Sequence, residues 1–304
     1  MPSILKGTSF QFSDTSEITT ERTGIRAIFG YGSTGSNTSV TNLVNNYGGV
    51  STDTTGVGTA RRDLAAAGYG GDKAIFGYGY TVSQVSMTNL VSNTGVVATD
   101  TTGVGTARYN LAAAGYGGDK AIFGYGRDSG PLSITNLVSN TGVVATDTAG
   151  VGTARDNLAA AGYGGDKAIF GYGSTNVTNL VSNTGVVATD TTGVGTSRYN
   201  LAAAGYGYDK AIFGYGIDTL NVRYSVTNLV SNAGVVATDT TGVGTAREAL
   251  AAAGYGGDKA IFGYGYTGSN VSMTNLVSNT GVVATDTTGV GTARYSLAAA
   301  SFGG

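Results

Sequence analysis

Short apolar runs, separated by clusters of glycine, serine, threonine and asparagine, recur along almost the whole chain. One run, AIFGYG, begins at six positions: Ala27, Ala74, Ala121, Ala168, Ala211 and Ala260. Each copy is followed in order by a TNLV segment, a VVATD-like segment, an arginine and a LAAAGYG-like segment. The runs are rich in β-branched and aromatic residues and are bounded by turn residues, which predicts strands. The pattern therefore predicts an all-β fold built from six repeats.

The length of the repeat indicates how the strands are arranged. A period of 43 to 49 residues with four strand-like segments is typical of β-propeller blades. LAAAGYG would then be the innermost strand, because only small side chains fit where six sheets converge on one axis. A short helix over LAAA is the alternative that stays open. The next residues, GGDK at 70–73, predict a tight hairpin turn with glycines at positive φ and an Asp-Lys pair in solvent; one copy carries Tyr208 in place of the second glycine.

The two ends of the chain each carry part of a repeat. The first unit begins at Ile25 with no LAAAGYG before it, and the chain ends on LAAASFGG with no AIFGYG after it. We therefore predict that residues 297–303 pair with residues 26–32. This pairing would close a six-bladed β-propeller of four-stranded antiparallel blades over residues 24–304 and remove its open sheet edges.

Residues 1–23 belong to no repeat and are treated as a separate N-terminal arm. Four apolar residues, Ile4, Leu5, Phe10 and Phe12, precede a polar segment in this arm. The arm either docks on a partner protein through these side chains or lies as a strap over one face of the ring. We predict docking.

The order of segments within a repeat resembles a known family. The succession R-x-x-L-A-A-A-G-Y, D-K-A-I-F-G-Y-G and S-M-T-N-L-V-S-N-T-G resembles a blade of the kelch family. In that family an inner strand after an arginine is followed by an apolar strand ending in glycines, a third strand and a turn. The chain departs from the family in having FGYG where a double glycine is typical and no tryptophan after the third strand.

Composition excludes several classes of function. Charged residues are 12% of the chain and the net charge is −2, which provides no basic field for nucleic acid or anionic lipid. Cysteine and histidine are absent, so disulfides, thiolate or imidazole catalysis and the copper site of kelch-like oxidases are not expected. No apolar run approaches the roughly 18 residues that span a bilayer, and no secretory signal is predicted. We predict a protein without enzymatic activity or cofactor; a hydrolase built from Asp and Tyr is the alternative.

Three repeated motifs could carry chemistry. GYGGDK has the composition of a phosphate-binding loop, but such a loop precedes a helix, and here a strand is predicted to follow. An aspartate recurs eight residues before each repeat arginine, as in Asp100 and Arg108, and is either an acid-base partner of that arginine or a cap for its own loop. The tyrosines of FGYG either stack on sugar rings or pack between blades. We predict a structural role for all three motifs.

Differences between the repeats are confined to two places. The insert between AIFGYG and TNLV varies in length and composition, and so do the two residues after each arginine, such as residues 62–63. Alternating strand directions place the inserts on the face opposite the GYGGDK and SNTG turns. Variable loops on a rigid scaffold often bind partners, although neutral drift is the alternative. The predicted contact residues are Tyr80, Arg127, Asp128, Asp218, Arg223, Tyr224 and Tyr266.

The style of the repeats also resembles a class of viral proteins. Near-identical kelch-like units of small residues, following a short unrepeated N-terminal segment, resemble propeller proteins of tailed bacteriophages. This resemblance implies a non-enzymatic structural component on the exterior of the virion. The arm would bind other virion proteins of the capsid, neck or tail, and the variable loops would contact host-surface polysaccharide. The alternative is a free lectin with equivalent carbohydrate sites in all six blades.

Overall fold

The computed structural model describes residues 24–303, which form eighteen β-strands and contain no helix. The AAAGY-type strands are β3 (Ala65–Tyr69), β6 (Ala112–Tyr116), β9 (Ala159–Tyr163), β12 (Ala202–Tyr206), β15 (Ala251–Tyr255) and β18 (Ala298–Phe302). The strands from AIFG are β1 (Arg26–Gly30), β4 (Lys73–Gly77), β7 (Lys120–Gly124), β10 (Lys167–Gly171), β13 (Lys210–Gly214) and β16 (Lys259–Gly263). The TNLV strands are β2 (Thr41–Val44), β5 (Thr88–Val91), β8 (Thr135–Val138), β11 (Thr178–Val181), β14 (Thr227–Val230) and β17 (Thr274–Val277). The all-β prediction is confirmed, and a helix over LAAA is excluded.

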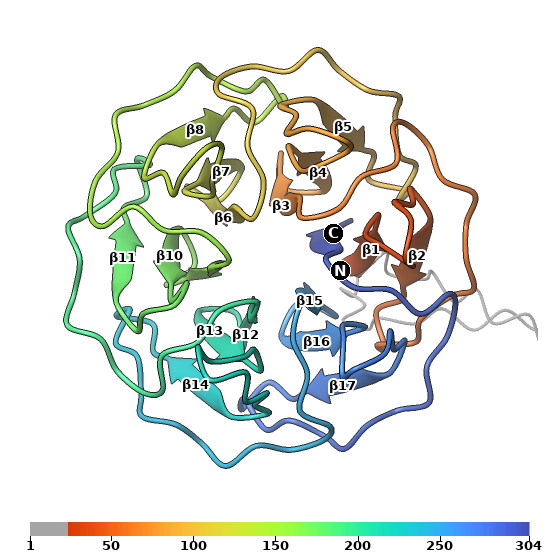
Figure 1. Ribbon diagram of the computed structural model, residues 1–304, viewed down its shortest axis with the longest axis vertical. Helices are drawn as coiled ribbons and strands as arrows, with labels where there is room; N and C mark the ends of the chain where they lie inside the picture. Colours follow the sequence, from red (N-terminus) through yellow and green to blue (C-terminus); the bar gives the residue numbers. More distant parts are fainter. Residues whose placement is uncertain (1–23, 304) are drawn as a thin grey trace, which may run out of the picture.

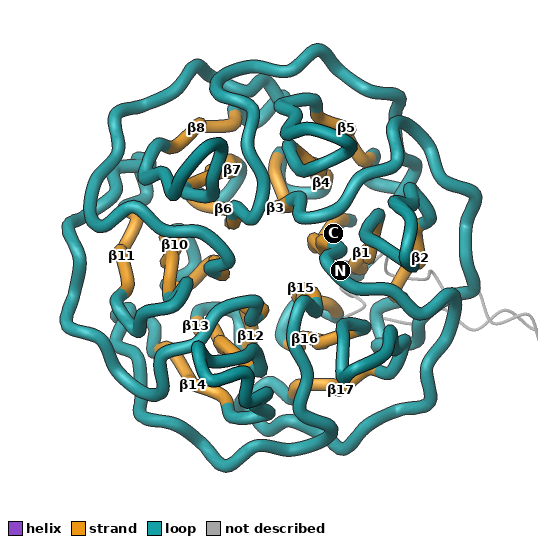
Figure 2. The backbone as a smooth tube through the Cα atoms, viewed as in Figure 1, coloured by secondary structure: helices purple, strands orange, loops and turns teal. Residues whose placement is uncertain are grey.

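The strands form six antiparallel sheets of three strands each, as in β3-β4-β5. Figure 1 shows the six sheets arranged around a central axis, with the AAAGY strands innermost. Each innermost strand contacts the next one, in the cycle β3, β6, β9, β12, β15, β18 and back to β3. Long connections pass around the outside from one sheet to the next (Figure 2).

The prediction of four strands in each sheet is wrong. The VVATD segment touches the third strand at two isolated bridges, Val91 with Val97 and Thr88 with Thr101, and forms no continuous ladder. A side chain takes one of the backbone acceptors that a ladder would use, since Asn89 Nδ2 donates to Ala98 O and to Asp100 Oδ1. Each sheet therefore has three strands and an outer segment that is held by separate hydrogen bonds, such as Thr101 N to Thr88 O and Ala98 N to Leu90 O.

Packing between the sheets explains the FGYG motif. Tyr78 is fully buried, and its ring centroid lies 5.1 Å from that of Phe123 in the next sheet. A Cβ on Gly77 would lie 2.6 Å from Phe123 Cζ, so glycine is required there for the neighbouring ring to approach. The equivalent tyrosines are buried in all six sheets. The prediction that these tyrosines pack between sheets is confirmed, and sugar stacking on them is excluded.

The GGDK segments form the predicted hairpin turns. Gly70 and Gly71 have φ of 64° and 81°, and Lys73 Nζ lies 2.7 Å from Asp72 Oδ1. Strand β4 begins at Lys73, so the helix that a phosphate-binding loop requires is not formed. The SNTG turns lie beside these hairpins, because Asn93 Nδ2 donates to Asp72 Oδ2. We call this side of the molecule the turn face and the opposite side, with the variable inserts, the variable face.

The chain ends pair as predicted. Strand β18 pairs antiparallel with β1, from Arg26 opposite Phe302 to Gly30 opposite Ala298. Two cycles of backbone hydrogen bonds also run through all six sheets. On the turn face Gly70 N donates to Asp119 O, and the cycle returns through Gly303 N to Asp72 O. On the variable face the cycle joins Asp63, Asn110, Asn157, Asn200, Ala249 and Ser296.

Deleting residues 297–304 should lower the free energy of unfolding by at least about 5 kcal/mol. The deletion removes β18 together with the buried Leu297 and Phe302, and it leaves β1 as an open edge. Urea and thermal denaturation measure the change. A truncated chain as stable as the full chain would contradict the pairing of the two ends.

Candidate functional site

A buried arginine lies at the start of every sheet. Arg61, just before β3, is fully buried. Its Nε donates to Tyr78 O at 2.8 Å, its Nη2 to Asn89 Oδ1 at 2.7 Å and its Nη1 to Thr59 O at 3.1 Å. The guanidinium also lies 4.4 Å from the ring centroid of Tyr31 in the preceding sheet. Because Arg61 contacts both sheets and the connection between them, it fixes how they pack.

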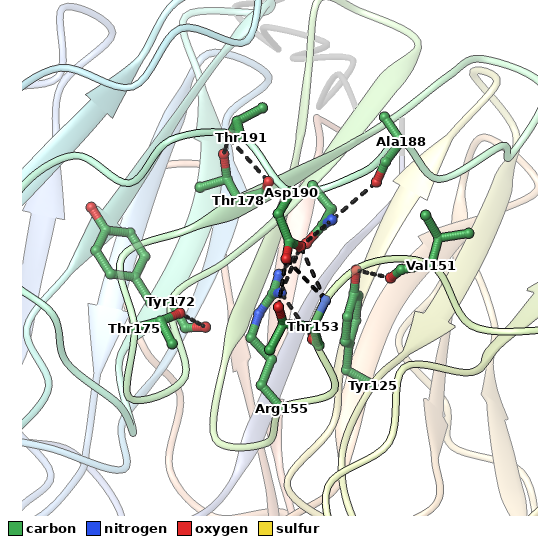
Figure 3. Close-up of polar contacts among 11 residues, drawn as sticks. Tyr125, Val151, Thr153, Arg155, Tyr172, Thr175, Thr178, Ala188, Asp190 and Thr191 are labelled. Atoms are coloured by element: carbon green, nitrogen blue, oxygen red, sulfur yellow. Dashed lines mark hydrogen bonds and ion pairs between the residues drawn. The ribbon is translucent and has the colours of Figure 1, made fainter.

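An aspartate completes each of these sites. Asp100 accepts hydrogen bonds from Thr59 N at 3.0 Å, Thr59 Oγ1 at 2.6 Å and Asn89 Nδ2 at 2.9 Å. Its Oδ1 lies 3.8 Å from Arg61 Nη1. We call this set of arginine, asparagine, aspartate, threonine and tyrosine the arginine clasp. Figure 3 shows the clasp in which Arg155 and Asp190 meet at Thr153.

The prediction that each aspartate caps its own loop is wrong, and so is a pairing with the arginine eight residues later, because the hydrogen bonds of the aspartate go to a different connection. Asp100 binds the connection through Thr59 and the clasp of Arg61, whereas Arg108, eight residues after Asp100, starts the next sheet. The chain leaves the outer edge of one sheet before it reaches the next arginine, so neighbours in sequence belong to different clasps. The same geometry closes the ring, since Asp53 binds Thr292 N near Arg294.

Burial and hydrogen bonding shift the pKa values of the clasp. Burial raises the pKa of Asp100, but hydrogen bonds from Thr59 and Asn89 and the charge of Arg61 outweigh it, so the net pKa is lowered. Burial lowers the pKa of Arg61 and raises that of Tyr31 to about 12. The aspartate therefore stays ionised and hydrogen-bonded, which suits a structural anchor.

One clasp differs from the other five. Arg155 Nε has no hydrogen-bond acceptor among residues 24–303, whereas the other five clasp arginines donate from Nε to a tyrosine carbonyl. The insert in this sheet is also the shortest of the six, and its Ser174 has φ of 63°.

The two variable places in the sequence form one structural position. The residue after FGYG bridges the residue after the arginine, as Tyr80 does with Arg62. Equivalent bridges join 33 with 295, 127 with 109, 217 with 199 and 266 with 248. The variation is therefore concentrated on paired residues near the axis of the variable face.

Contacts between sheets link these paired positions. The Tyr80 and Tyr109 rings lie 5.3 Å apart, and the guanidinium of Arg62 lies 4.9 Å from the Tyr80 centroid. Arg127 pairs with Asp156 at 2.9 Å. Tyr80 and Arg127 are thus brought together through Tyr109, a residue that sequence reasoning left out of the predicted contact residues.

A second cluster joins residues from the sheets β12-β13-β14, β15-β16-β17 and β18-β1-β2. The Tyr266 and Tyr295 rings lie 5.6 Å apart, and the guanidinium of Arg223 lies 5.1 Å from the Tyr266 centroid. Arg223 also pairs with Glu248 at 3.0 Å. We call Arg62, Tyr80 and Tyr109, together with Arg223, Tyr266 and Tyr295, the two arginine–tyrosine clusters.

The remaining predicted contact residues support their own loops. Asp128 accepts hydrogen bonds from the backbone N–H groups of Ser129 and Gly130, and Asp218 accepts one from the Tyr224 hydroxyl at 2.9 Å. Among residues 24–303, no hydrogen bond or ion pair joins Asp128, Asp218 or Tyr224 to either arginine–tyrosine cluster. The missed cluster residues Arg62, Tyr109 and Tyr295 share a signal, since each follows a repeat arginine at a place where the repeats differ.

The predicted docking residues Ile4, Leu5, Phe10 and Phe12 lie outside the described residues. The point where the arm joins the ring is described: Gly256 N donates to Ile25 O on the turn face. Ile25, at the start of the described residues, therefore lies on the face opposite the variable inserts.

In comparisons with known proteins, no family model and no curated protein matches the chain. Within the described part of the chain, no group of acidic side chains is arranged to hold a metal ion. Over the same residues, no helix has the length and apolar character needed to cross a membrane.

Replacing Arg108 by methionine should lower the free energy of unfolding by roughly 3 kcal/mol, because Asn136 Oδ1 and Tyr125 O lose a buried donor. Arg155→Met should cost roughly 1 kcal/mol less, since the Nε hydrogen bond is missing there. Urea denaturation of both variants provides the comparison. Equal losses of unfolding free energy in the two variants would contradict the conclusion that Arg108 makes an Nε hydrogen bond that Arg155 lacks.

Stability should fall as the pH drops below about 4. The clasp aspartates have pKa values below those of the unfolded chain, so their contribution is complete above the unfolded value and is lost as the pH falls through the folded one. Urea denaturation between pH 7 and pH 2 measures the loss. Asp100→Asn should be less stable at pH 7 and lose less on acidification; the same pH dependence as the parent would contradict a role for Asp100.

Proposed function

We propose that the chain is a kelch-like six-bladed β-propeller that serves as a non-enzymatic structural component on the exterior of a tailed-phage virion. The N-terminal arm binds other virion proteins, and the variable face contacts host-surface polysaccharide. The observation that carries this proposal is the position of the two features: the arm joins on the turn face, and the variable residues lie on the opposite face.

The arrangement of the sheets supports the propeller. Six sheets lie around one axis, their innermost strands contact one another in a cycle, and β18 pairs with β1. Closure of this kind protects sheet edges and gives a rigid scaffold. Each sheet is a three-stranded blade in this proposal, and its VVATD segment lies along the outer strand without joining the sheet.

The clasps support a structural role. Their arginine, asparagine and aspartate groups recur in all six repeats, and they hydrogen-bond to one another and to the backbone. Packing between blades therefore accounts for these residues without a reaction. A charged group this well satisfied has little capacity left for a substrate.

The variable face supports binding through loops. The two arginine–tyrosine clusters carry aromatic rings beside paired charges, which suits the apolar faces and hydroxyl groups of sugars. A free lectin with six equivalent sites is less well supported, because Ser33, Thr175 and Ile217 stand near the positions of Tyr80 and Tyr266 in other blades.

The double variant Tyr80→Ser, Tyr266→Ser should bind the envelope polysaccharide of the host about tenfold or more weakly than the parent, since each ring contributes roughly 1 kcal/mol. Serine already occupies the equivalent position at Ser33, so the fold is expected to persist. Biolayer interferometry on immobilised polysaccharide measures the affinity.

The matched control is Val143→Thr, an exposed position on the turn face, which should leave binding unchanged. Mass spectrometry of purified virions tests the location of the protein. Its absence from virions would contradict the structural role, and equal binding by parent and double variant would contradict the contact surface.

A further inference from the structure

The turn face contains a central cavity around the axis. Two adjoining hollows of about 260 Å³ and 270 Å³ share six lining residues: Ile25, Gly68, Gly115, Gly162, Tyr208 and Ser301. The shared lining makes them one cavity. Glycines of five inner strands, such as Gly68 and Gly115, line it, and Ser301 takes the same place in β18.

The rim of this cavity is polar, and its charges are largely balanced. Five lysines line it, and each pairs with the aspartate before it at 2.6 to 3.6 Å: Lys73, Lys120, Lys167, Lys210 and Lys259. Such pairs present hydrogen-bond donors and acceptors side by side with little net field. This chemistry suits a ligand whose groups both donate and accept hydrogen bonds.

Tyr208 breaks the repeat at this cavity. The four equivalent turns have glycine at this position: Gly71, Gly118, Gly165 and Gly257. Tyr208 has φ of 70°, a left-handed conformation that is strained for a tyrosine, and its side chain is 78% exposed. It borders both hollows, and its Cε1 lies 3.9 Å from where a Cβ on Gly257 would be. A strained, exposed aromatic ring is thus held at the mouth of the cavity.

We propose that this cavity is a binding site for a short neutral saccharide, with Tyr208 as the platform for one sugar ring. The C–H face of a pyranose packs on an aromatic ring, and its hydroxyl groups can bond to the lysine–aspartate rim. The two hollows together reach the range of small-molecule sites, about 300–1,000 Å³. The site lies on the face opposite the arginine–tyrosine clusters, so it does not depend on their proposed role.

The test uses the full chain and the variant Tyr208→Gly, which copies the turn of the other repeats. Saturation-transfer NMR and calorimetry are carried out with glucose, galactose, N-acetylglucosamine and their trisaccharides at up to about 20 mM. We expect at least one of these sugars to bind the parent, and Tyr208→Gly to bind it about tenfold more weakly. The melting temperature should stay unchanged or rise by up to about 2 °C, because the strained conformation is relieved.

Two further variants separate the ring from other effects. Tyr208→Phe keeps the aromatic face and should retain binding. Tyr47→Thr removes another tyrosine that breaks the repeat; Tyr47 is 83% exposed in the hairpin after β2 but does not line the cavity, so binding should be unchanged.

Three results would overturn the proposal: no binding of any sugar in the panel, equal binding by Tyr208→Gly, or tighter binding of inorganic phosphate than of any sugar. The polysaccharide test on Tyr80 and Tyr266 concerns the opposite face. Each proposal can therefore fail without the other.

Discussion

The structure depends on six buried guanidinium groups. An arginine cannot lose its charge in a protein, so burial of Arg61 is tolerated only because Tyr78 O, Asn89 and Thr59 O accept its hydrogen bonds. These acceptors come from a strand end, the next strand and the incoming connection. Satisfying one side chain therefore fixes the distance between two sheets and the path of the chain between them.

This constraint explains which parts of the chain vary. Residues of the clasp and the FGYG packing recur in nearly identical form, because the same interface is built six times around the axis. The inserts lie outside that interface and change freely in length. The shortest insert coincides with the one clasp that lacks its Nε hydrogen bond, so the two regions are not fully independent.

Departures from the repeat are also unevenly placed. On the variable face they form paired positions and two arginine–tyrosine clusters; on the turn face they include Tyr208 and Ile25, both at the central cavity. Ile25 takes the place of an aspartate in the turn-face cycle, since its carbonyl accepts from Gly256 N.

The sequence alone determined the all-β class, the six repeats, the hairpin turns and the pairing of the chain ends, because these follow from local composition and from counting copies. It could not show that Asp100 meets Arg61 and not Arg108, since that contact joins segments far apart in the chain. Nor could it show that the Asn89 side chain binds Ala98 O, although these two residues are only nine apart, since the strand pattern does not fix where a side-chain amide is directed. The predicted contact residues were identified by variation, but Tyr109 and Tyr295 were missed. In the tertiary structure, the residue after an arginine in one sheet lies beside the insert of the neighbouring sheet, as Tyr109 lies beside Tyr80 and Tyr295 beside Tyr266. Only the tertiary structure decides these contacts, because they form where the sheets converge at the axis.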